Sequence, residues 1–142
     1  MTIRGRLIHR APHFSVRLRF AGAEGDVWFL ADTGAARTTI LDRDATDLGI
    51  PGDALEPMSD PIVGIGGPVR SWLLRGTELV FPSTDGPIVL RHDICVTRHD
   101  VAQLSAPVAH RVLRLPSILA RDIIDRFRFV YERATGTVLL ER

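Results

Sequence analysis

Alternation of apolar and polar residues is the feature that most restricts what this chain can fold into. In residues 13–21, HFSVRLRFA, every second residue from Phe14 to Phe20 is apolar, which places the apolar side chains on one face of a β-strand. The apolar run VWFL, residues 27–30, is typical of a strand that is buried on both faces. Similar strand patterns return over residues 38–41, 76–82, 87–96, 127–132 and 136–141. We therefore predict an all-β fold class, mostly β with one or two short helices.

Two segments have helical spacing instead. In LDRDATDLGIP, residues 41–51, apolar residues recur every three or four positions before Gly49, which predicts a short helix that ends there. In PSILARDIIDRF, Pro116 and Ser117 are suited to the start of a helix. We predict this second helix over about residues 117–127.

Length and charge exclude several classes of protein. The chain has 142 residues, which fits a single domain spanning residues 1–142. Its formal net charge is +1 with acids and bases interspersed, so we expect no nucleic acid and no membrane among its partners. No stretch approaches the roughly 20 apolar residues of a membrane span, and the first residues lack the apolar core of a signal peptide. A cytoplasmic location is expected.

An acidic residue interrupts the apolar run in FLADTGAARTTIL, residues 29–41. A carboxylate at the end of a buried strand costs several kcal/mol if it stays unpaired. One explanation is that Asp32 only begins a turn, because Asp, Thr and Gly all favour turns. The other explanation is that Asp32 has a function. The tripeptide Asp32-Thr33-Gly34 does not decide between the two by itself.

A glycine-rich segment follows in PIVGIGGPVRSWLL, residues 61–74. Gly66 and Gly67 lie between two apolar arms, which predicts a β-hairpin whose tip approaches another backbone closely. Phosphate binding is disfavoured, because GIGGPV lacks the last glycine of G-x-G-x-x-G and no helix pattern follows it.

FLADTGAARTTI, PIVGIGGPV and LPSILARDIIDRF, in this order and spacing, resemble segments of the retropepsin-like aspartic proteases. The resemblance covers nearly the whole chain and implies a closed β-barrel with one Asp-Thr-Gly lobe per chain, acting as a homodimer. It implies a flap hairpin over about residues 60–75. The implied catalytic residues are Asp32, Thr33 and Gly34. The implied substrate-binding residues are Ala35, Ile62, Val63, Gly64, Ile65, Gly66 and Gly67, and Arg121 and Ala120 are implied to support the site.

The chemistry of peptide hydrolysis agrees with this resemblance. One ionised carboxylate takes a proton from water while one protonated carboxyl polarises the scissile carbonyl. A two-fold axis would bring Asp32 of each subunit together, so that the pair shares a proton. Dimerisation would then create the active site, with a protein or peptide as substrate and with no cofactor and no metal. We expect the apolar terminal segments, residues 3–8 and 137–141, to be candidates for the dimer sheet.

The sequence departs from the family pattern after Asp-Thr-Gly-Ala and before the Arg-Asp pair. Ala36 and Arg37 stand where many retroviral members have an acid after Asp-Thr-Gly-Ala, and Ala120 replaces a glycine that usually precedes the Arg-Asp pair. The extra methyl group of Ala120 is expected to crowd the catalytic loop. These departures leave an alternative open, a catalytically silent peptide-binding or dimerisation module with the same fold. A monomer that dimerises only with substrate or at high concentration is a further possibility.

Other polar residues receive structural interpretations. We expect Arg121 to pair with Asp42, Asp122 or another carboxylate, which suits its planar guanidinium. Cys95 lies in an apolar alternation and is interpreted as a small buried residue, not as a catalytic thiol. The three histidines of the region after residue 90 match no zinc spacing and are interpreted as solvated. They are His92, His99 and His110.

Overall fold

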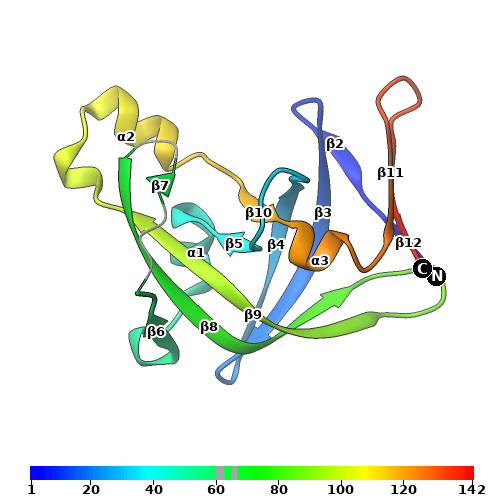
Figure 1. Ribbon diagram of the computed structural model, residues 1–142, viewed down its shortest axis with the longest axis horizontal. Helices are drawn as coiled ribbons and strands as arrows, with labels where there is room; N and C mark the ends of the chain where they lie inside the picture. Colours follow the sequence, from blue (N-terminus) through cyan, green and yellow to red (C-terminus); the bar gives the residue numbers. More distant parts are fainter. Residues whose placement is uncertain (60–62, 65–66) are drawn as a thin grey trace.

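The fold consists mainly of strands (Figure 1). The computed structural model describes residues 1–59, 63–64 and 67–142, with the backbone alone at residues 63, 64, 67 and 68. The strands are β1 (Thr2–Arg4), β2 (Arg6–Ile8), β3 (Ala11–Phe20), β4 (Ala23–Ala31), β5 (Thr39–Ile40), β6 (Leu55–Pro57), β7 (Val63–Gly64), β8 (Gly67–Phe81), β9 (Ile88–His99), β10 (Ser117–Leu119), β11 (Arg128–Glu132) and β12 (Thr137–Glu141). The helices are α1 (Asp42–Leu48), α2 (Ala106–Val112) and α3 (Arg121–Ile124), with 3₁₀ turns η1 (Gly52–Ala54) and η2 (Val101–Gln103).

The larger sheet closes on itself. Its strands follow the order β2-β3-β4-β10-β5-β9-β8-β6, and β3 pairs with β8 as well as with β4. Leu18 of β3 lies opposite Leu79 of β8, and both side chains are fully buried in the core together with Phe14, Phe29 and Phe81. The predicted closed β-barrel is confirmed, because alternating strands can bury one face only when the sheet curls around it.

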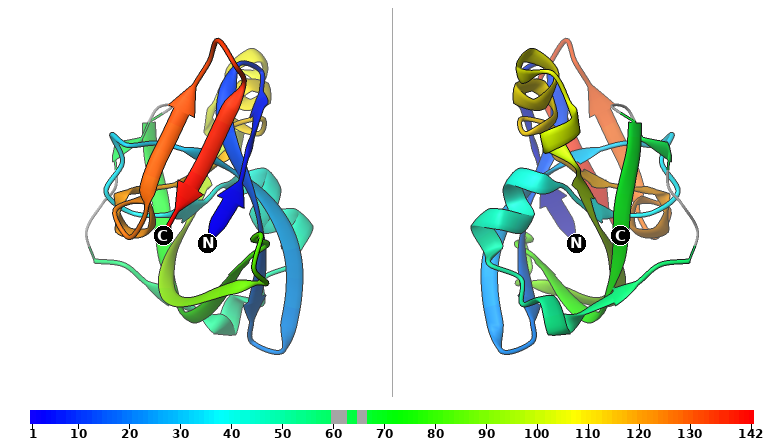
Figure 2. Two further views of the ribbon diagram at one scale, coloured as in Figure 1. Left: turned by 90° about the vertical axis from the view of Figure 1, so that its right-hand side faces the viewer. Right: turned by 90° about the vertical axis from the view of Figure 1, so that its left-hand side faces the viewer.

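A smaller three-stranded sheet joins the two ends of the chain. Its order is β1-β12-β11, and Figure 2 shows the three strands side by side with the termini adjacent. A hairpin connects β11 to β12, with Gly136 at a positive φ of 70°. Among the described residues, β1 and β11 each have one edge without a strand partner.

Helix α1 confirms the first helix prediction. Gly49 follows it in the left-handed conformation, with φ of 59°, and its N–H bonds the Thr46 carbonyl. Glycine adopts this conformation without the cost of a Cβ contact, so it ends the helix here.

The second helix prediction, over residues 117–127, is wrong for most of that range. Residues Ser117–Leu119 form β10, which pairs parallel with β4 and antiparallel with β5. The helix α3 covers only Arg121–Ile124. Tertiary pairing overrides local spacing here, because the gap between β4 and β5 offers hydrogen bonds on both sides of a short apolar segment.

Helix α2 was not predicted. Ser105 precedes it and Pro107 lies in its first turn, which is a usual start signal. No helix of the described residues is both long enough and apolar enough to cross a membrane.

Gly5 connects the two sheets at a point of close packing. Its N–H donates to the Val138 carbonyl at 2.8 Å. A Cβ atom at Gly5 would lie 2.5 Å from the His13 carbonyl oxygen and 2.7 Å from Val138 Cγ1. Both contacts are too short for any real side chain, so one of the two sheets would have to shift.

We predict that Gly5→Ala lowers the free energy of unfolding by about 1–3 kcal/mol, a usual cost of overpacking. Urea unfolding at a fixed protein concentration measures the change. Gly52→Ala is the matched control, because a Cβ there meets nothing within 4 Å. Equal stability of the two variants would contradict the packing described for Gly5.

Candidate active site

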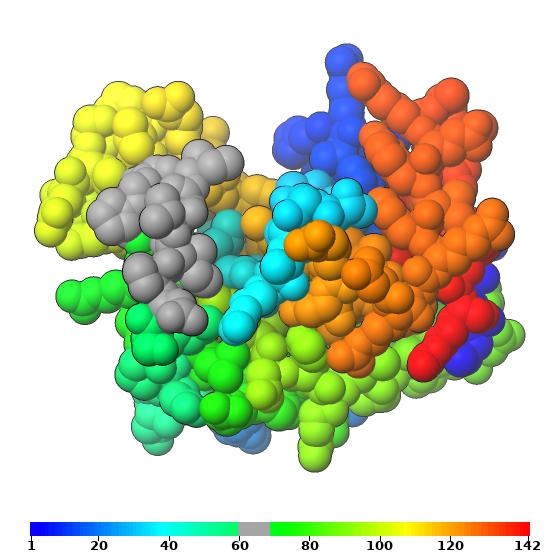
Figure 3. Space-filling model, in the orientation of Figure 1, coloured from blue at the N-terminus to red at the C-terminus, as the bar shows by residue number. Residues whose placement is uncertain are grey.

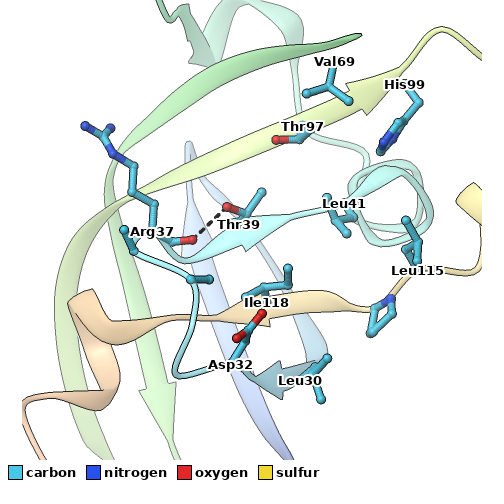
Figure 4. Close-up of a pocket in the computed structure, with 13 residues that line it drawn as sticks. Leu30, Asp32, Arg37, Thr39, Leu41, Val69, Thr97, His99, Leu115 and Ile118 are labelled. Atoms are coloured by element: carbon cyan, nitrogen blue, oxygen red, sulfur yellow. Dashed lines mark hydrogen bonds between the residues drawn. The ribbon is translucent and has the colours of Figure 1, made fainter. Parts of the chain in front are cut away.

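Asp32 lies directly after β4, at the start of a tight turn. Its N–H donates to the Leu119 carbonyl of β10 at 2.9 Å. Its Oδ1 accepts a hydrogen bond from the Gly34 N–H at 2.8 Å. Oδ2 accepts none from the described residues, and Figure 4 shows the carboxylate at the cavity beside Ile118. One oxygen therefore holds the turn and the other remains available for chemistry.

Thr33 and Gly34 lie on the surface, next to this carboxylate. Both residues are exposed, and the Thr33 hydroxyl has no hydrogen-bond partner among the described residues. A Cβ at Gly34 would lie 3.2 Å from Asp32 Oδ1, so a side chain there would press on the oxygen that closes the turn. Glycine, which has no Cβ, avoids this contact.

Thr38 fixes the far end of the same loop to helix α3. Its N–H donates to Asp122 Oδ2 at 2.9 Å, and its hydroxyl donates to Asp122 Oδ1 at 2.6 Å. The same hydroxyl accepts from the Ala120 N–H at 3.1 Å. His92 Nε2 lies 2.9 Å from Asp122 Oδ2. Asp122 is therefore a positioning residue whose two oxygens hold the loop in one conformation.

Arg121 supports the loop in a different way from the one predicted. Its backbone N–H and its Nε both donate to the Ala35 carbonyl, at 3.1 and 3.3 Å. The predicted carboxylate partner is wrong for the part of the chain that the structure describes, because Asp42 binds His99 and Asp122 binds Thr38 and His92. Arg121 acts on the backbone of the loop, not on an acid.

Ala120 occupies its position without strain. Its side chain is fully buried, and its φ of −108° with ψ of −177° is extended backbone that any residue adopts. The backbone conformation at this position therefore does not require glycine. In the space-filling view, the loop in cyan and α3 in orange lie side by side on the surface (Figure 3).

A cavity of about 510 Å³ opens in front of Asp32. Its walls come from the loop, from β5, β8, β9 and β10, and from the segment before β10. The residues that line it are Leu30, Asp32, Ala35, Ala36, Arg37, Thr39, Leu41, Val69, Thr97, His99, Leu115, Pro116 and Ile118. Ala35 lines it, as predicted, and most of the other side chains are apolar. Such a cavity suits apolar side chains of a ligand.

The predicted flap is described only in part. Backbone pairing joins β7 to the start of β8, with Val63 opposite Pro68 and Gly64 opposite Gly67. An antiparallel hairpin therefore lies within the predicted range. Ile62, Ile65 and Gly66 lie outside the described residues.

Comparison with known proteins agrees with this geometry. The family model described as Aspartyl protease matches residues 16–110. The chain belongs to the aspartyl protease family. The match includes the loop that carries Asp32 and the hairpin above it. No curated protein matches the sequence.

Two solved retropepsin-like structures are similar to this aspartyl protease family member. A retropepsin-like aspartic protease from Rickettsia conorii is 16% identical with a TM-score of 0.55, over 99% of this chain and 97% of that one. The EIAV protease, solved with an inhibitor, is 18% identical with a TM-score of 0.52, over 82% of this chain and 86% of that one. At this identity the likeness shows the fold, which is the one predicted.

The structure also corrects the interpretation of two histidines. His99 is not solvated, because its side chain is 4% exposed and bonds Asp42. His92 is partly buried against Asp122, whereas His110 is exposed as predicted. The continuing alternation of Cys95, Thr97 and His99 was the signal that could have placed His99 inside.

Cys95 agrees with its interpretation as a buried residue. It is 1% exposed, and burial raises the pKa of its thiol. A raised pKa disfavours the thiolate, so Cys95 is unsuited to act as a nucleophile. In the described ranges, no group of three or more His, Cys, Asp or Glu side chains is arranged to hold a metal ion.

We predict that Thr38→Val destabilises the protein by about 1–3 kcal/mol, because the Ala120 N–H and one Asp122 oxygen lose their partner. Thr38→Ser keeps the hydroxyl and loses one methyl group, at a cost of about 1 kcal/mol. Thermal unfolding of both variants provides the measurement. A valine variant as stable as the serine variant would show that the hydroxyl does not hold the loop.

Proposed function

We propose that this protein is a homodimeric aspartic endopeptidase that hydrolyses peptide bonds of an extended polypeptide. Water would be activated between two Asp32 carboxylates, one from each subunit. The observation that carries the proposal is the division of labour within Asp32, where Oδ1 holds the Gly34 N–H and Oδ2 is available beside an apolar cavity. A carboxylate that served only the turn would not need to line a cavity.

The proposed mechanism uses one proton shared by the two acids. Repulsion between like charges opposes the ionisation of both carboxyl groups at close distance. One Asp32 therefore acts as the base towards water while the other donates a hydrogen bond to the scissile carbonyl. Exposed Thr33 and Gly34 would meet the same residues of the second subunit across the two-fold axis. Their hydrogen-bonding groups would then be used within the dimer.

Substrate binding is proposed to involve the cavity and the hairpin together. Ala35 would contact the substrate, and the tip of the hairpin, Gly64 to Gly67, would close over it and add main-chain hydrogen bonds, as if the peptide were an extra strand. The apolar walls favour apolar substrate side chains. Arg37, the second residue after the Asp-Thr-Gly-Ala segment, adds a positive charge to the lining of the same cavity.

The terminal sheet is the proposed dimer contact. Because β1 pairs with β12 inside the chain, the second subunit would add to the open edges of β1 and β11. Val138 and Leu140 of β12 are buried core residues, so deleting β12 would unfold the chain before it tested the dimer. Dilution of the intact protein is the better experiment.

A catalytically silent peptide-binding module remains the second candidate. The replacements at Ala36 and Ala120 motivate it. Against it stand the ordinary backbone conformation of Ala120 and the hydrogen bonds that hold the loop to Ala120 and Arg121. We also propose that residues 1–142 form one domain, since one barrel core includes residues from Ile3 to Leu140. The cytoplasmic location stays a prediction.

We predict that Asp32→Asn lowers the rate of peptide cleavage by at least about a hundredfold, because it removes the acid that exchanges the proton. Cleavage of a mixed unstructured peptide pool from pH 4 to 8, read by mass spectrometry, is the measurement. Asp53→Asn, at an exposed position that does not line the cavity, is the matched control and should cleave normally. Cleavage that persists in a pure, folded Asp32→Asn protein would rule the mechanism out.

We also predict that specific activity and molecular mass fall together on dilution. An active site shared between subunits exists only in the dimer, so both quantities depend on protein concentration in the same way. Sedimentation and peptide cleavage, measured over the same concentration series, give the two curves. A monomer that keeps full activity would contradict the shared site.

A further inference from the structure

Asp42 and His99 form a buried pair at the cavity that the proposed hydrolysis does not use. The backbone N–H of His99 donates to Asp42 Oδ1, and Nδ1 lies against Oδ2, both at 2.7 Å. The side chains are 4% exposed for His99 and 9% exposed for Asp42. His99 lines the cavity, whereas Asp42 lies behind it as the first residue of α1. Asp42 therefore fixes the orientation of the His99 ring from the side away from the cavity.

One ring nitrogen of His99 is left to face the cavity. Carboxylate oxygens only accept hydrogen bonds, so Nδ1 carries the proton in the bond to Asp42. Nε2 has no hydrogen-bond partner among the described residues. No buried side-chain nitrogen or oxygen of those residues lacks a partner, which means that Nε2 is not enclosed in the core. It reaches the surface of the cavity that His99 lines.

The surroundings of this nitrogen are mainly apolar. In Figure 4, His99 lies at one side of the cavity with Leu41, Val69 and Leu115, and the Arg37 side chain extends at the opposite side. Thr97 precedes His99 by two residues on β9 and lines the same cavity. The His99 end of the cavity thus combines apolar walls with a held imidazole nitrogen.

We propose that His99 is a specificity-determining residue, whose Nε2 binds the hydroxyl group at the end of an otherwise apolar substrate side chain. Tyrosine is the coded residue that combines a large apolar body with a terminal hydroxyl. This assignment rests on the proposed function, because it names a substrate preference of the same cleft.

A hydroxyl group matches Nε2 in both charge states of the ring. It donates to the lone pair of a neutral imidazole and accepts from the N–H of a charged one. The aromatic ring would pack against Leu41, Val69 and Leu115. Phenylalanine would make the same apolar contacts but would leave Nε2 covered and without a partner, which is the costly case.

The experiment compares tyrosine with phenylalanine in an otherwise constant peptide. A peptide that the wild-type protein cuts is resynthesised with each residue at every position flanking the cut, and kcat/KM is measured. We expect one position at which tyrosine exceeds phenylalanine by about tenfold. In His99→Asn, the amide nitrogen keeps a donor for Asp42 while Nε2 is removed, and the ratio should fall to about one.

His110→Asn is the matched control, because His110 is exposed on α2, and it should keep the tenfold ratio. A merely structural role of His99 would lower both rates and leave the ratio unchanged, so a folded His99→Asn protein with an unchanged ratio overturns the assignment. Equal rates for the two peptides at every position of the wild-type protein overturn it without any variant.

Failure of the proposed function gives a different result. In that case verified wild-type dimers cut no peptide at all, and the tyrosine and phenylalanine peptides are compared by calorimetric binding. Tighter binding of a tyrosine peptide that is lost in His99→Asn supports the assignment for a binding module. Equal or absent binding overturns it.

Discussion

The insertion of β10 between β4 and β5 is the interaction on which the site depends. Its three residues, Ser117–Leu119, pair with β4, Ile118 also pairs with Thr39 of β5, and the Leu119 carbonyl accepts the Asp32 N–H. The two residues that follow, Ala120 and Arg121, bond Thr38 and Ala35 on the loop that carries Asp32. A loop that would otherwise be free at the end of a strand is thereby fixed at its start, middle and end. Such fixation is what a positioned catalytic group requires.

Much of the fold was predictable because its signals are local. Residues of β3 alternate strictly, α1 ends at a glycine with positive φ, and the β11–β12 hairpin contains Gly136. The strand β10 was not predictable from the spacing of its residues, since Ile118 and Leu119 suit a helix equally well. β4 and β5 are distant from β10 in the sequence, and only the hydrogen-bonding groups of these two strands favour a strand at Ser117–Leu119.

In the candidate site, too, some residues have a local signal in the sequence and others do not. Asp32, Thr33 and Gly34 were recognisable because an acidic residue interrupts the apolar run of a buried strand. The supporting residues were less visible, because Thr38, Asp122 and His99 have ordinary neighbours in the sequence and acquire their roles through contacts formed on folding. Arg121 illustrates the limit well, since a charged side chain was expected to find an acid and instead holds a backbone carbonyl. Local spacing predicts many of the elements, whereas the partners of a side chain depend on how those elements pack.

The central claim is that two Asp32 carboxylates meet in one cleft. A crystal structure of the protein bound to a peptide analogue, in which a hydroxyl group replaces the scissile bond, tests it most directly, because such an analogue resembles the transition state. The account predicts one analogue per dimer, with its hydroxyl within about 3 Å of a carboxylate oxygen from each subunit. A structure in which the two Asp32 residues lie on separate faces, with the analogue bound to one of them or to neither, would contradict it.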